Sequence, residues 1–440
     1  MINNMISQEE YKLRRQKLSK SIDEGVLILS GNTSYIRNHD VEFDFRQNSD
    51  FWYLTGFNEP NAVLVMTFNP AIEYILFVEP YDVNYHIWLG ERAGIEGAIN
   101  NFMADKAYPL NEINNIIPEI ITEFNNIYYR NGSNSNIDSI INEYSNSNLR
   151  SVTGSRGNYN LRKNDVIEST SIIDPIPFIS HLRLYKSDNE IELIKNAINI
   201  SKTGFEHILN ILRPGINEYE IQTELEYQFR KNGSRYNAYP SIVASGGNAC
   251  VLHYINNNSS LNDDEFILID AGAEYENYAS DITRTYVVSN NINPIKQTIY
   301  DIVFDAQQKA INSVKPGSTL SSIHKIALEI LIQGLIDIKI LKGSIDEIIE
   351  MDLYKEFYMH GTSHWLGLDV HDTSPYTINE KEIILEPGMI FTVEPGLYFS
   401  NRSSYSDKNQ VLSGTGVRIE DDILVTENGH INLSTDISYR

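Results

Sequence analysis

The sequence predicts an α/β domain followed by a larger α+β domain, and three observations carry this prediction. Before about residue 170, short apolar runs alternate with segments of helical spacing, as is typical of an α/β domain. Asp174-Pro-Ile-Pro177 interrupts regular structure and predicts a linker. After it, two Pro-Gly turns about one hundred residues apart each precede a helical pattern, which favours duplicated halves. The predicted domains are 1–175 and 176–440.

In the first domain, the predicted strands are short apolar runs at residues 26–29, 62–66 and 74–78, bounded by Gly, Asn and Pro. Residues 8–22 and 112–124 carry apolar side chains at helical spacing. The domain contains neither Gly-x-Gly-x-x-Gly nor a phosphate loop, so nucleotide binding has little support.

In the second domain, a helix is predicted to begin at Ser187, because Ser187-Asp-Asn-Glu190 forms a capping box ahead of an apolar helical pattern. Leu212-Arg-Pro-Gly215 and Val314-Lys-Pro-Gly317 then each precede a further helix. A chance pairing of two turns is the alternative to a true repeat. In duplicated α+β halves, helices would cover one face of a sheet and leave the other face to acidic residues.

The composition limits the classes of function. A formal net charge of -24 on 440 residues argues against partners with phosphate backbones and against anionic membrane surfaces. The single cysteine, Cys250, excludes an internal disulfide framework and fits a reducing compartment. We find no secretory leader pattern and no run near the roughly 18 apolar residues of a membrane span. We therefore expect a cytoplasmic protein.

Four acidic residues at expected strand ends, together with one histidine, are the most informative feature of the second domain. Carboxylates are depleted in strands and are almost never fully buried without a partner. Several carboxylates around one interior would repel each other unless cations were bound there. Four oxygen donors and one imidazole suit two divalent ions of the manganese, cobalt, iron or zinc kind, as in a hydrolase. The residues are Asp270, Asp281, His364, Glu394 and Glu420.

The surroundings of these residues support that interpretation. Residues 271–280 can fold back as a hairpin, so that Asp270 and Asp281 face the same side; a lone strand-end aspartate also occurs in nucleotide folds and plain turns. If 417–425 is one strand, Arg418, Glu420 and Asp422 share one face. Arg418 then either orients a ligand carboxylate or forms a simple ion pair.

Three histidines, His360, His364 and His371, lie within twelve positions of a chain that has ten. Gly361 and Gly367 and the absence of a His-Glu-x-x-His glutamate argue against a helical zinc motif. We expect an extended or looped segment that directs all three into one cleft. For any single one, a hydrogen-bonded core histidine is the alternative.

These segments, taken in order, resemble the metallopeptidases of the pita-bread fold, and within them the bacterial Xaa-Pro aminopeptidases (aminopeptidase P). The resemblance is carried by Ile269-Asp-Ala-Gly272, Ala279-Ser-Asp-Ile-Thr-Arg-Thr285, His360-Gly-Thr-Ser-His-Trp-Leu-Gly-Leu-Asp-Val-His-Asp372, Leu385-Glu-Pro-Gly-Met389, Val393-Glu-Pro-Gly396 and Val417-Arg-Ile-Glu-Asp-Asp422. Phe45-Arg-Gln-Asn-Ser-Asp-Phe-Trp-Tyr-Leu-Thr-Gly-Phe-Asn-Glu-Pro60 resembles the leading domain of the same subfamily. The match covers nearly the whole chain.

The resemblance implies a pita-bread catalytic domain behind a smaller α/β domain that shapes the cleft and mediates assembly into a homodimer or homotetramer. It implies two divalent ions, manganese first and cobalt, zinc or iron as alternatives. Asp281 and Glu420 would bridge both ions, with Asp270 on one and His364 and Glu394 on the other. His253, His360 and His371 would lie on the substrate side. Relatives often carry an arginine in the stretch 373–381, and this chain has none there, so a carboxylate-binding role for that loop is in doubt.

The implied reaction is hydrolysis of the bond between a free N-terminal residue and a following proline. Glu394 is the expected proton shuttle, and His371 and His253 are expected to stabilise the oxyanion. His360 is expected to hold the peptide beyond the scissile bond. The expected apolar wall against proline consists of Trp365, Tyr398 and, across a subunit contact, Trp88, with ordinary core or surface aromatics as the alternative.

Three rival functions remain open. A prolidase would use the same ligands on dipeptides. A methionine aminopeptidase would share the metal set but lack a substantial leading domain. A non-catalytic peptide-binding module would be expected to lose ligands, and all five positions are filled here; a metal-independent creatinase-like enzyme is disfavoured for the same reason.

Overall fold

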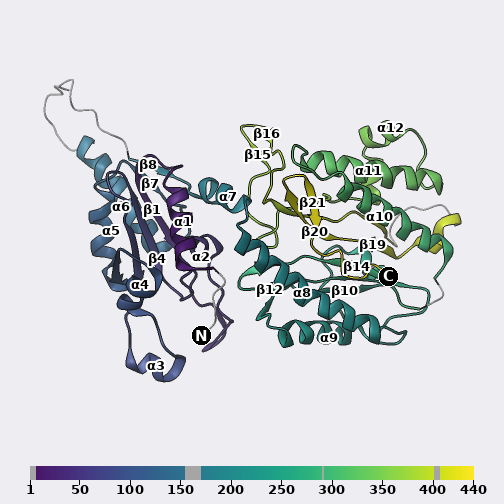
Figure 1. The fold of residues 1–440 in the computed structure, drawn as a ribbon, viewed down its shortest axis with the longest axis horizontal. Helices are drawn as coiled ribbons and strands as arrows, with labels where there is room; N and C mark the ends of the chain where they lie inside the picture. The colour runs from purple at the N-terminus through teal and green to yellow at the C-terminus, as the bar shows by residue number, and fades with distance from the viewer. Residues whose placement is uncertain (1–5, 154–169, 290–291, 401–406) are drawn as a thin grey trace. The chain divides into compact units, whose positions relative to one another are not determined.

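A computed structural model gives the fold and describes residues 6–153, 170–289, 292–400 and 407–440 (Figure 1). The chain divides into two units, Met1–Leu182 and Arg183–Arg440. Within those described ranges, no helix combines the length and the apolar character that a membrane span requires.

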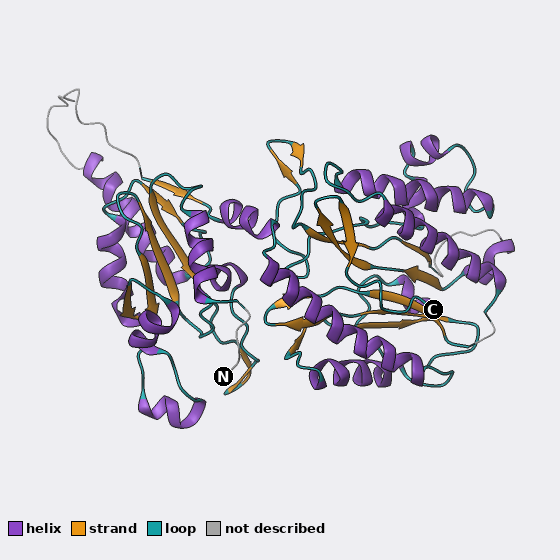
Figure 2. Cartoon of the chain, in the orientation of Figure 1, coloured by secondary structure: helices purple, strands orange, loops and turns teal. Residues whose placement is uncertain are grey.

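The first unit is built on one mixed sheet with the strand order β6-β5-β4-β1-β7-β8 (Figure 2). The predicted strands are confirmed as β1, β4 and β5, which pair antiparallel, and the predicted helices as α1 and α5. The bounds are α1 Gln8–Leu18, β1 Gly25–Ser30, β2 Ile36–Asn38, β3 Val41–Glu42, α2 Ser49–Thr55, β4 Val63–Phe68, β5 Tyr74–Val78, α3 Val83–Leu89, α4 Gly94–Phe102, β6 Lys106–Pro109, α5 Ile113–Ile121, β7 Asn126–Tyr128, α6 Ser135–Thr153 and β8 Ser171–Ile173.

Alternation along the strands gives this unit its core. Val26 and Ile28 of β1 and Val63 and Val65 of β4 point to one face and pack with Ile117 of α5 in one apolar cluster. Each of these side chains is fully buried.

The second unit contains the remaining helices and several small sheets. Its bounds are α8 Asp188–Ile211, α9 Glu218–Lys231, β9 Tyr236–Asn237, β10 Ile242–Ser245, β11 Phe266–Asp270, β12 Ala273–Tyr275, β13 Tyr278–Ala279, β14 Thr283–Val287, α10 Pro294–Asn312, α11 Leu320–Asp337, α12 Ile345–Glu350, β15 Thr377–Ile378, β16 Lys381–Glu382, β17 Ile390–Val393, β18 Gly396–Phe399, β19 Thr415–Arg418, β20 Asp421–Thr426 and β21 Gly429–Asn432. The predicted capping box at Ser187 opens α8, as expected.

The predicted linker is only partly irregular. Helix α7 (Ile176–Leu184) begins inside it, because the Asp174 side chain accepts a hydrogen bond of 3.0 Å from the Ile176 N–H group. Pro177 lies in the first turn, where a missing N–H is tolerated.

The two Pro-Gly turns make equivalent contacts in the two halves, as a repeat predicts. In the first half, the Gly215 N–H group donates to Leu261 O at 2.8 Å; in the second, the Gly317 N–H group donates to Leu385 O at 3.0 Å. Each leucine stands nine residues before a predicted ligand, Asp270 and Glu394 respectively. The helix pair α8 and α9 corresponds in this way to α10 and α11; Asp270 ends β11 in the first half, and Glu394 directly follows β17 in the second.

Strand register places the remaining carboxylates. Asp270 at the end of β11 is opposite Thr283, the first residue of β14, so Asp281 lies just before that strand. Val393 at the end of β17 is opposite Asp421, the first residue of β20, so Glu394 and Glu420 lie together. Each half therefore contributes two carboxylates at one end of an antiparallel pair.

The prediction of a single strand over residues 417–425 is wrong. Residues 417–425 form two strands, β19 paired with β18 and β20 paired with β17 and β21, with Ile419 and Glu420 between them. The Glu420 N–H group donates to Thr283 O at 3.0 Å, which draws the backbone out of a single ladder. Asp422, the second residue of β20, is buried and accepts from the Asp281 N–H group at 3.1 Å.

Candidate metal centre

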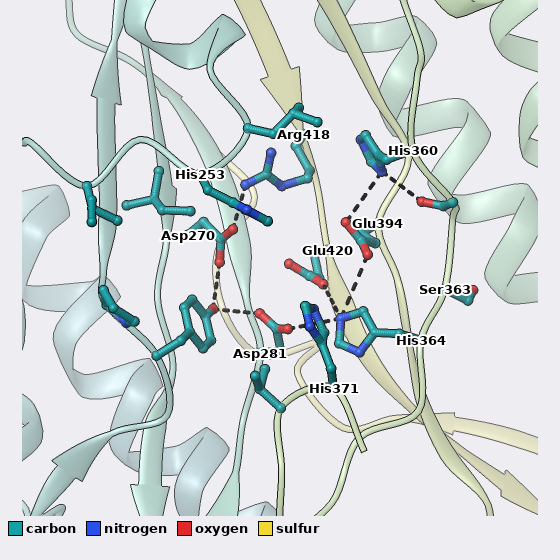
Figure 3. Close-up of a pocket in the computed structure, with 17 residues that line it drawn as sticks. His253, Asp270, Asp281, His360, Ser363, His364, His371, Glu394, Arg418 and Glu420 are labelled. Atoms are coloured by element: carbon teal, nitrogen blue, oxygen red, sulfur yellow. Dashed lines mark hydrogen bonds and ion pairs between the residues drawn. The ribbon is translucent and has the colours of Figure 1, made fainter. Parts of the chain in front are cut away.

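A cavity of about 660 Å³ in the second unit brings most of the predicted site residues together (Figure 3). All five expected ligands contribute to its lining, as do His253, His360, His371 and Arg418. The five ligand positions come from four strand ends and one loop, which are far apart in the sequence. The strand pairings described above bring them together.

Three of these residues are close enough to share an ion. One ligand atom each from Asp281, His364 and Glu420 lies within 4.8 Å of the others. His364 Nε2 is 3.2 Å from Asp281 Oδ2 and 3.8 Å from Glu394 Oε1, so Glu394 lies beside the same histidine. This arrangement can hold at least one divalent ion with oxygen and imidazole ligands.

Tyr239 connects Asp270 to this group. Its hydroxyl lies 2.6 Å from Asp270 Oδ1 and 2.5 Å from Asp281 Oδ1. A phenol has a single proton to donate, so two carboxylates compete for one hydrogen bond. Both aspartates line the same cavity, as the hairpin β12–β13 between them was expected to allow.

The segment that carries His364 is extended, as expected. The Thr392 N–H group donates to His364 O at 2.9 Å, and the Glu394 N–H group donates to Thr362 O at 2.8 Å. Trp365 forms an isolated bridge with Phe391. Residues 362–366 thus run beside β17, and this pairing fixes His364 next to the end of the strand that carries Glu394.

The charges of the cluster are poorly balanced without a cation. Burial raises the pKa of Asp270, although the Arg418 charge opposes this effect. Burial, followed by the charges of Asp281 and Glu394, raises the pKa of Glu420 well above its usual range. Burial also raises the pKa of Glu394 to about 7, against the charges of His364 and Arg418. Divalent ions would relieve this repulsion, so the residues present fit a metal centre.

His364 responds to the same carboxylates. Burial by itself lowers the pKa of its imidazole, but the hydrogen bond and charge of Asp281, with Glu394, raise it to about 9. A proton therefore occupies the position that a metal ion would take.

A chain of hydrogen bonds leads from Asp270 to His360. Arg418 Nη2 is 2.5 Å from Asp270 Oδ2, and Nη1 is 3.0 Å from the Tyr398 hydroxyl. That hydroxyl lies 2.8 Å from His360 Nε2, while His360 Nδ1 lies 2.7 Å from Gly361 O. Because a carbonyl only accepts, Nδ1 carries the proton and Nε2 accepts from Tyr398. Burial, helped by the Arg418 charge, lowers the pKa of His360 to about 4, so it is neutral at pH 7.

His371 lies over His364, with ring centroids 4.4 Å apart and planes at 82°. Burial and the neighbouring His364 lower the pKa of His371. The next residue, Asp372, is buried between two buried cations, Arg183 and Lys186, and Lys186 Nζ is 3.3 Å from Asp372 Oδ2. This cluster fixes the turn that presents His371.

The comparisons with known proteins agree with this geometry. Residues 192–427 match the model of metallopeptidase family M24, and residues 11–128 match that of the aminopeptidase P N-terminal domain. The chain belongs to metallopeptidase family M24. Its fold is accordingly an aminopeptidase P N-terminal domain followed by a pita-bread catalytic domain.

Relatives within the family match nearly the whole chain. The Xaa-Pro aminopeptidase of Escherichia coli is 37% identical over 438 residues, which covers 98% of this chain and 96% of the relative. Xaa-Pro aminopeptidase 3 of Mus musculus is 32% identical and covers 98% of this chain and 84% of the relative. The structure of aminopeptidase PepP from Pseudomonas aeruginosa matches with a TM-score of 0.90 at 38% identity, covering 99% and 96% of the two chains.

The three aromatic residues that were expected to form a wall against proline do not line the cavity of about 660 Å³. Trp365 is fully buried in a core cluster, where Nε1 donates to Pro375 O at 3.0 Å, so its assignment to the wall is wrong. Tyr398 is 1% exposed and lies behind Arg418 and His360, outside the lining, so it positions other groups instead. Trp88 is 84% exposed on α3 of the first unit, and its contact with substrate stays a prediction.

An aliphatic wall takes the place of the expected aromatic one. Its members are Pro240, Ile242, Leu252, Ile255 and Val370. Neither this wall nor Tyr239 was identified from the sequence. The wall residues are scattered apolar positions with no common spacing, and Tyr239 gave no signal beyond a proline that follows it.

Proposed function

We propose that this protein is an Xaa-Pro aminopeptidase that uses two divalent ions, manganese first, to release the N-terminal residue from peptides with proline in the second position. The observation that carries the proposal is the convergence of four carboxylates and His364 in one cavity. The relatives of this name extend over almost the entire chain, which supports the same activity.

The ligand assignment belongs to this proposal. Asp270, Asp281, His364, Glu394 and Glu420 would hold the two ions, because all five line one cavity and Asp281 approaches both His364 and, through Tyr239, Asp270. Ions bound there would lower the pKa of a bound water and polarise the scissile carbonyl. Cobalt, zinc or iron would fit the same mixed ligand set.

The remaining groups act on the peptide. Glu394 takes a proton from the attacking water and returns it to the departing proline nitrogen. His371 and His253 donate hydrogen bonds to the oxygen that becomes negatively charged, each worth on the order of 3 kcal/mol. Arg418 holds Asp270 in place, and neutral His360 contacts the peptide beyond the scissile bond. The substrate's ammonium group is attracted by the carboxylates.

Selectivity for proline is assigned to the aliphatic wall. Pro240, Ile242 and Leu252 line the same cavity as the carboxylates, and Ile242 is opposite Asp270 in the pairing of β10 with β11. A pyrrolidine ring buries its methylene groups against such a surface at about 0.8 kcal/mol for each one.

Four expectations from the sequence remain predictions of this proposal. They are the domain bounds 1–175 and 176–440, a cleft-shaping role for the first domain, assembly as a homodimer or homotetramer, and a cytoplasmic location.

Metal-depleted protein should be assayed on Arg-Pro-Pro, Ala-Pro and Met-Ala-Ser with added manganese or cobalt. We expect release of arginine from Arg-Pro-Pro. Cleavage of Ala-Pro alone would instead identify a prolidase, and cleavage of Met-Ala-Ser alone a methionine aminopeptidase. If none of the three peptides is cleaved, the enzyme assignment is overturned, and a non-catalytic peptide-binding module becomes the remaining interpretation.

A further inference from the structure

A second cavity, of about 290 Å³, adjoins the first, and the two share His360, Gly361 and Ser363 in their linings. We propose that this second cavity is the subsite for the residue that follows proline in the substrate, and that it selects a large apolar or aromatic side chain there. The inference rests on the proposed function and adds the third residue of the substrate to it.

The two linings meet at Gly361, where the backbone has open space beside it. A Cβ atom built at Gly361 would meet no atom within 4 Å, although the residue contributes to both linings. Ser363 is the other shared residue of interest. Its Oγ is buried and, among the described residues, finds no hydrogen-bond partner. Buried hydroxyls are nearly always paired, so an unpaired one between two cavities suits a peptide backbone group of a ligand.

The direction of the peptide follows from Glu394. This residue gives its proton to the proline nitrogen, so the departing part of the substrate begins beside it. Glu394 Oε2 is 3.7 Å from His360 Nδ1, and His360 stands between the two cavities. Figure 3 shows His360 and Ser363 on the same side of the carboxylate cluster, beyond Glu394. An extended chain advances about 3.3–3.6 Å per residue, so the residue after proline passes His360.

The chemistry of the second cavity favours an apolar side chain. Its walls include Leu320, Met359 and the rings of Tyr354, Tyr358 and Tyr376. The polar end of Tyr358 is already occupied, because its hydroxyl lies 2.6 Å from Thr362 Oγ1, which in turn lies 2.8 Å from His324 Nδ1. The rings therefore present carbon surface to a ligand.

The charge of the lining and the volume of the second cavity further limit which side chain can bind there. Lys355 is a lining residue, but its ammonium group pairs with Asp352 at 2.8 Å. Met359 is 48% exposed and Tyr376 49%, so the cavity is open to solvent at one side. The volume of about 290 Å³ is at the small end of the roughly 300–1,000 Å³ of ligand pockets, which suits one side chain and not a second peptide. A flexible thioether such as Met359 adapts to side chains of different shape.

The test compares kcat/KM for Ala-Pro-Xaa peptides in which Xaa is Gly, Ala, Leu or Phe. We expect leucine and phenylalanine to exceed glycine by about tenfold, as a pocket for several methylene groups allows. Met359→Ala enlarges the cavity and Gly361→Leu fills the space where the two linings meet, and both should reduce the Leu/Gly ratio several-fold. At Gly361 the first side-chain atom has open space around it, so Gly361→Leu keeps the proposal testable if Met359→Ala does not fold.

The matched control is Met351→Ala, because Met351 is 67% exposed and contributes to neither cavity. This variant should keep the wild-type Leu/Gly ratio. Binding is checked separately through product inhibition: Pro-Phe should inhibit more strongly than Pro-Gly, and Gly361→Leu should remove the difference.

Equal kcat/KM for all four peptides, or a preference that Gly361→Leu leaves intact, would overturn the subsite. Both results require turnover of proline peptides, so they leave the proposed aminopeptidase standing. Failure to cleave any of the four would contradict the proposed function instead.

Discussion

Arg418 donates a hydrogen bond to Asp270, with Nη2 2.5 Å from Oδ2, and both side chains are almost completely buried. The guanidinium is also held by Tyr398 and by Thr283 Oγ1 at 3.2 Å. Its charge opposes the burial that raises the pKa of Asp270, and so favours the carboxylate form. If Asp270 holds an ion, as proposed above, Arg418 controls how readily it does so.

We therefore expect Arg418→Met to weaken manganese binding at pH 7 by about 10- to 100-fold. The removal of the charge allows the pKa of Asp270 to rise further, so a proton competes with the ion. Calorimetric titration of metal-depleted protein measures the effect. Tyr398→Phe, which removes a neutral partner of the same guanidinium, should change the affinity much less. An unchanged affinity in a folded Arg418→Met protein would contradict the role assigned to Arg418.

The metal-free centre should make stability depend on pH. The pKa values of Glu394, at about 7, and His364, at about 9, both lie above their usual ranges. A raised folded-state pKa stabilises the fold below the ordinary value, and that contribution is lost as pH rises through the folded value. Metal-depleted protein should therefore melt at a lower temperature at pH 9.5 than at pH 6.5.

Manganese should reverse this trend. Binding must displace the His364 proton at low pH but not above about 9, so the affinity should increase with pH. Melting curves with and without manganese across pH 6–9.5 check both expectations. A melting temperature of the metal-depleted protein that does not fall above pH 7 would show that these groups are not coupled in the way described.

The buried ion cluster behind His371 gives a third prediction. Asp372 is 1% exposed and compensates Arg183 and Lys186, which are 2% and 1% exposed. Asp372→Asn leaves these cations without that compensation, so we expect a loss of about 3–5 kcal/mol in the free energy of unfolding. Asp369→Asn is the matched control: it removes a partner of Arg183 that is 33% exposed and should cost under about 1 kcal/mol. Urea denaturation compares the two, and equal losses would argue against the cluster.

Residues whose positions follow from local pattern were predictable from the sequence. Asp270 and Glu394 each end an apolar run, and their strands form as expected. Glu420 lines the cavity as expected, but the single strand expected over residues 417–425 is wrong. The hydrogen bond from the Glu420 N–H group to Thr283 O joins residues more than one hundred positions apart, so no local pattern in the sequence could indicate it.

Groups positioned only by tertiary packing could not be predicted. Tyr239 belongs to the site because the loop before β10 lays its hydroxyl against two carboxylates. Trp365 has the composition of a specificity residue but faces the core, because its strand-like neighbours pair with β17. Composition identifies an aromatic side chain, and only the pairing of its backbone decides which way it faces.

Glu218 provides the last prediction, which concerns the loop that carries His253. Although fully buried at the first position of α9, it accepts from both ends of residues 245–259: from the Ser245 N–H and hydroxyl groups at 2.7 Å, and from the Ser259 N–H group at 2.8 Å. Glu218→Gln replaces one acceptor oxygen with a donor that faces other donors. We expect a loss of about 2–4 kcal/mol in the free energy of unfolding and about a tenfold lower kcat, because His253 loses its fixed position.

The matched control is on the same helix. Glu220 is exposed and its carboxylate accepts the Asn217 N–H group in a capping box, so Glu220→Gln should cost at most about 1 kcal/mol and leave kcat unchanged. Thermal melts and initial rates on Arg-Pro-Pro test both variants. If Glu218→Gln melts and turns over like Glu220→Gln, the loop is held by its own packing and His253 does not depend on this carboxylate.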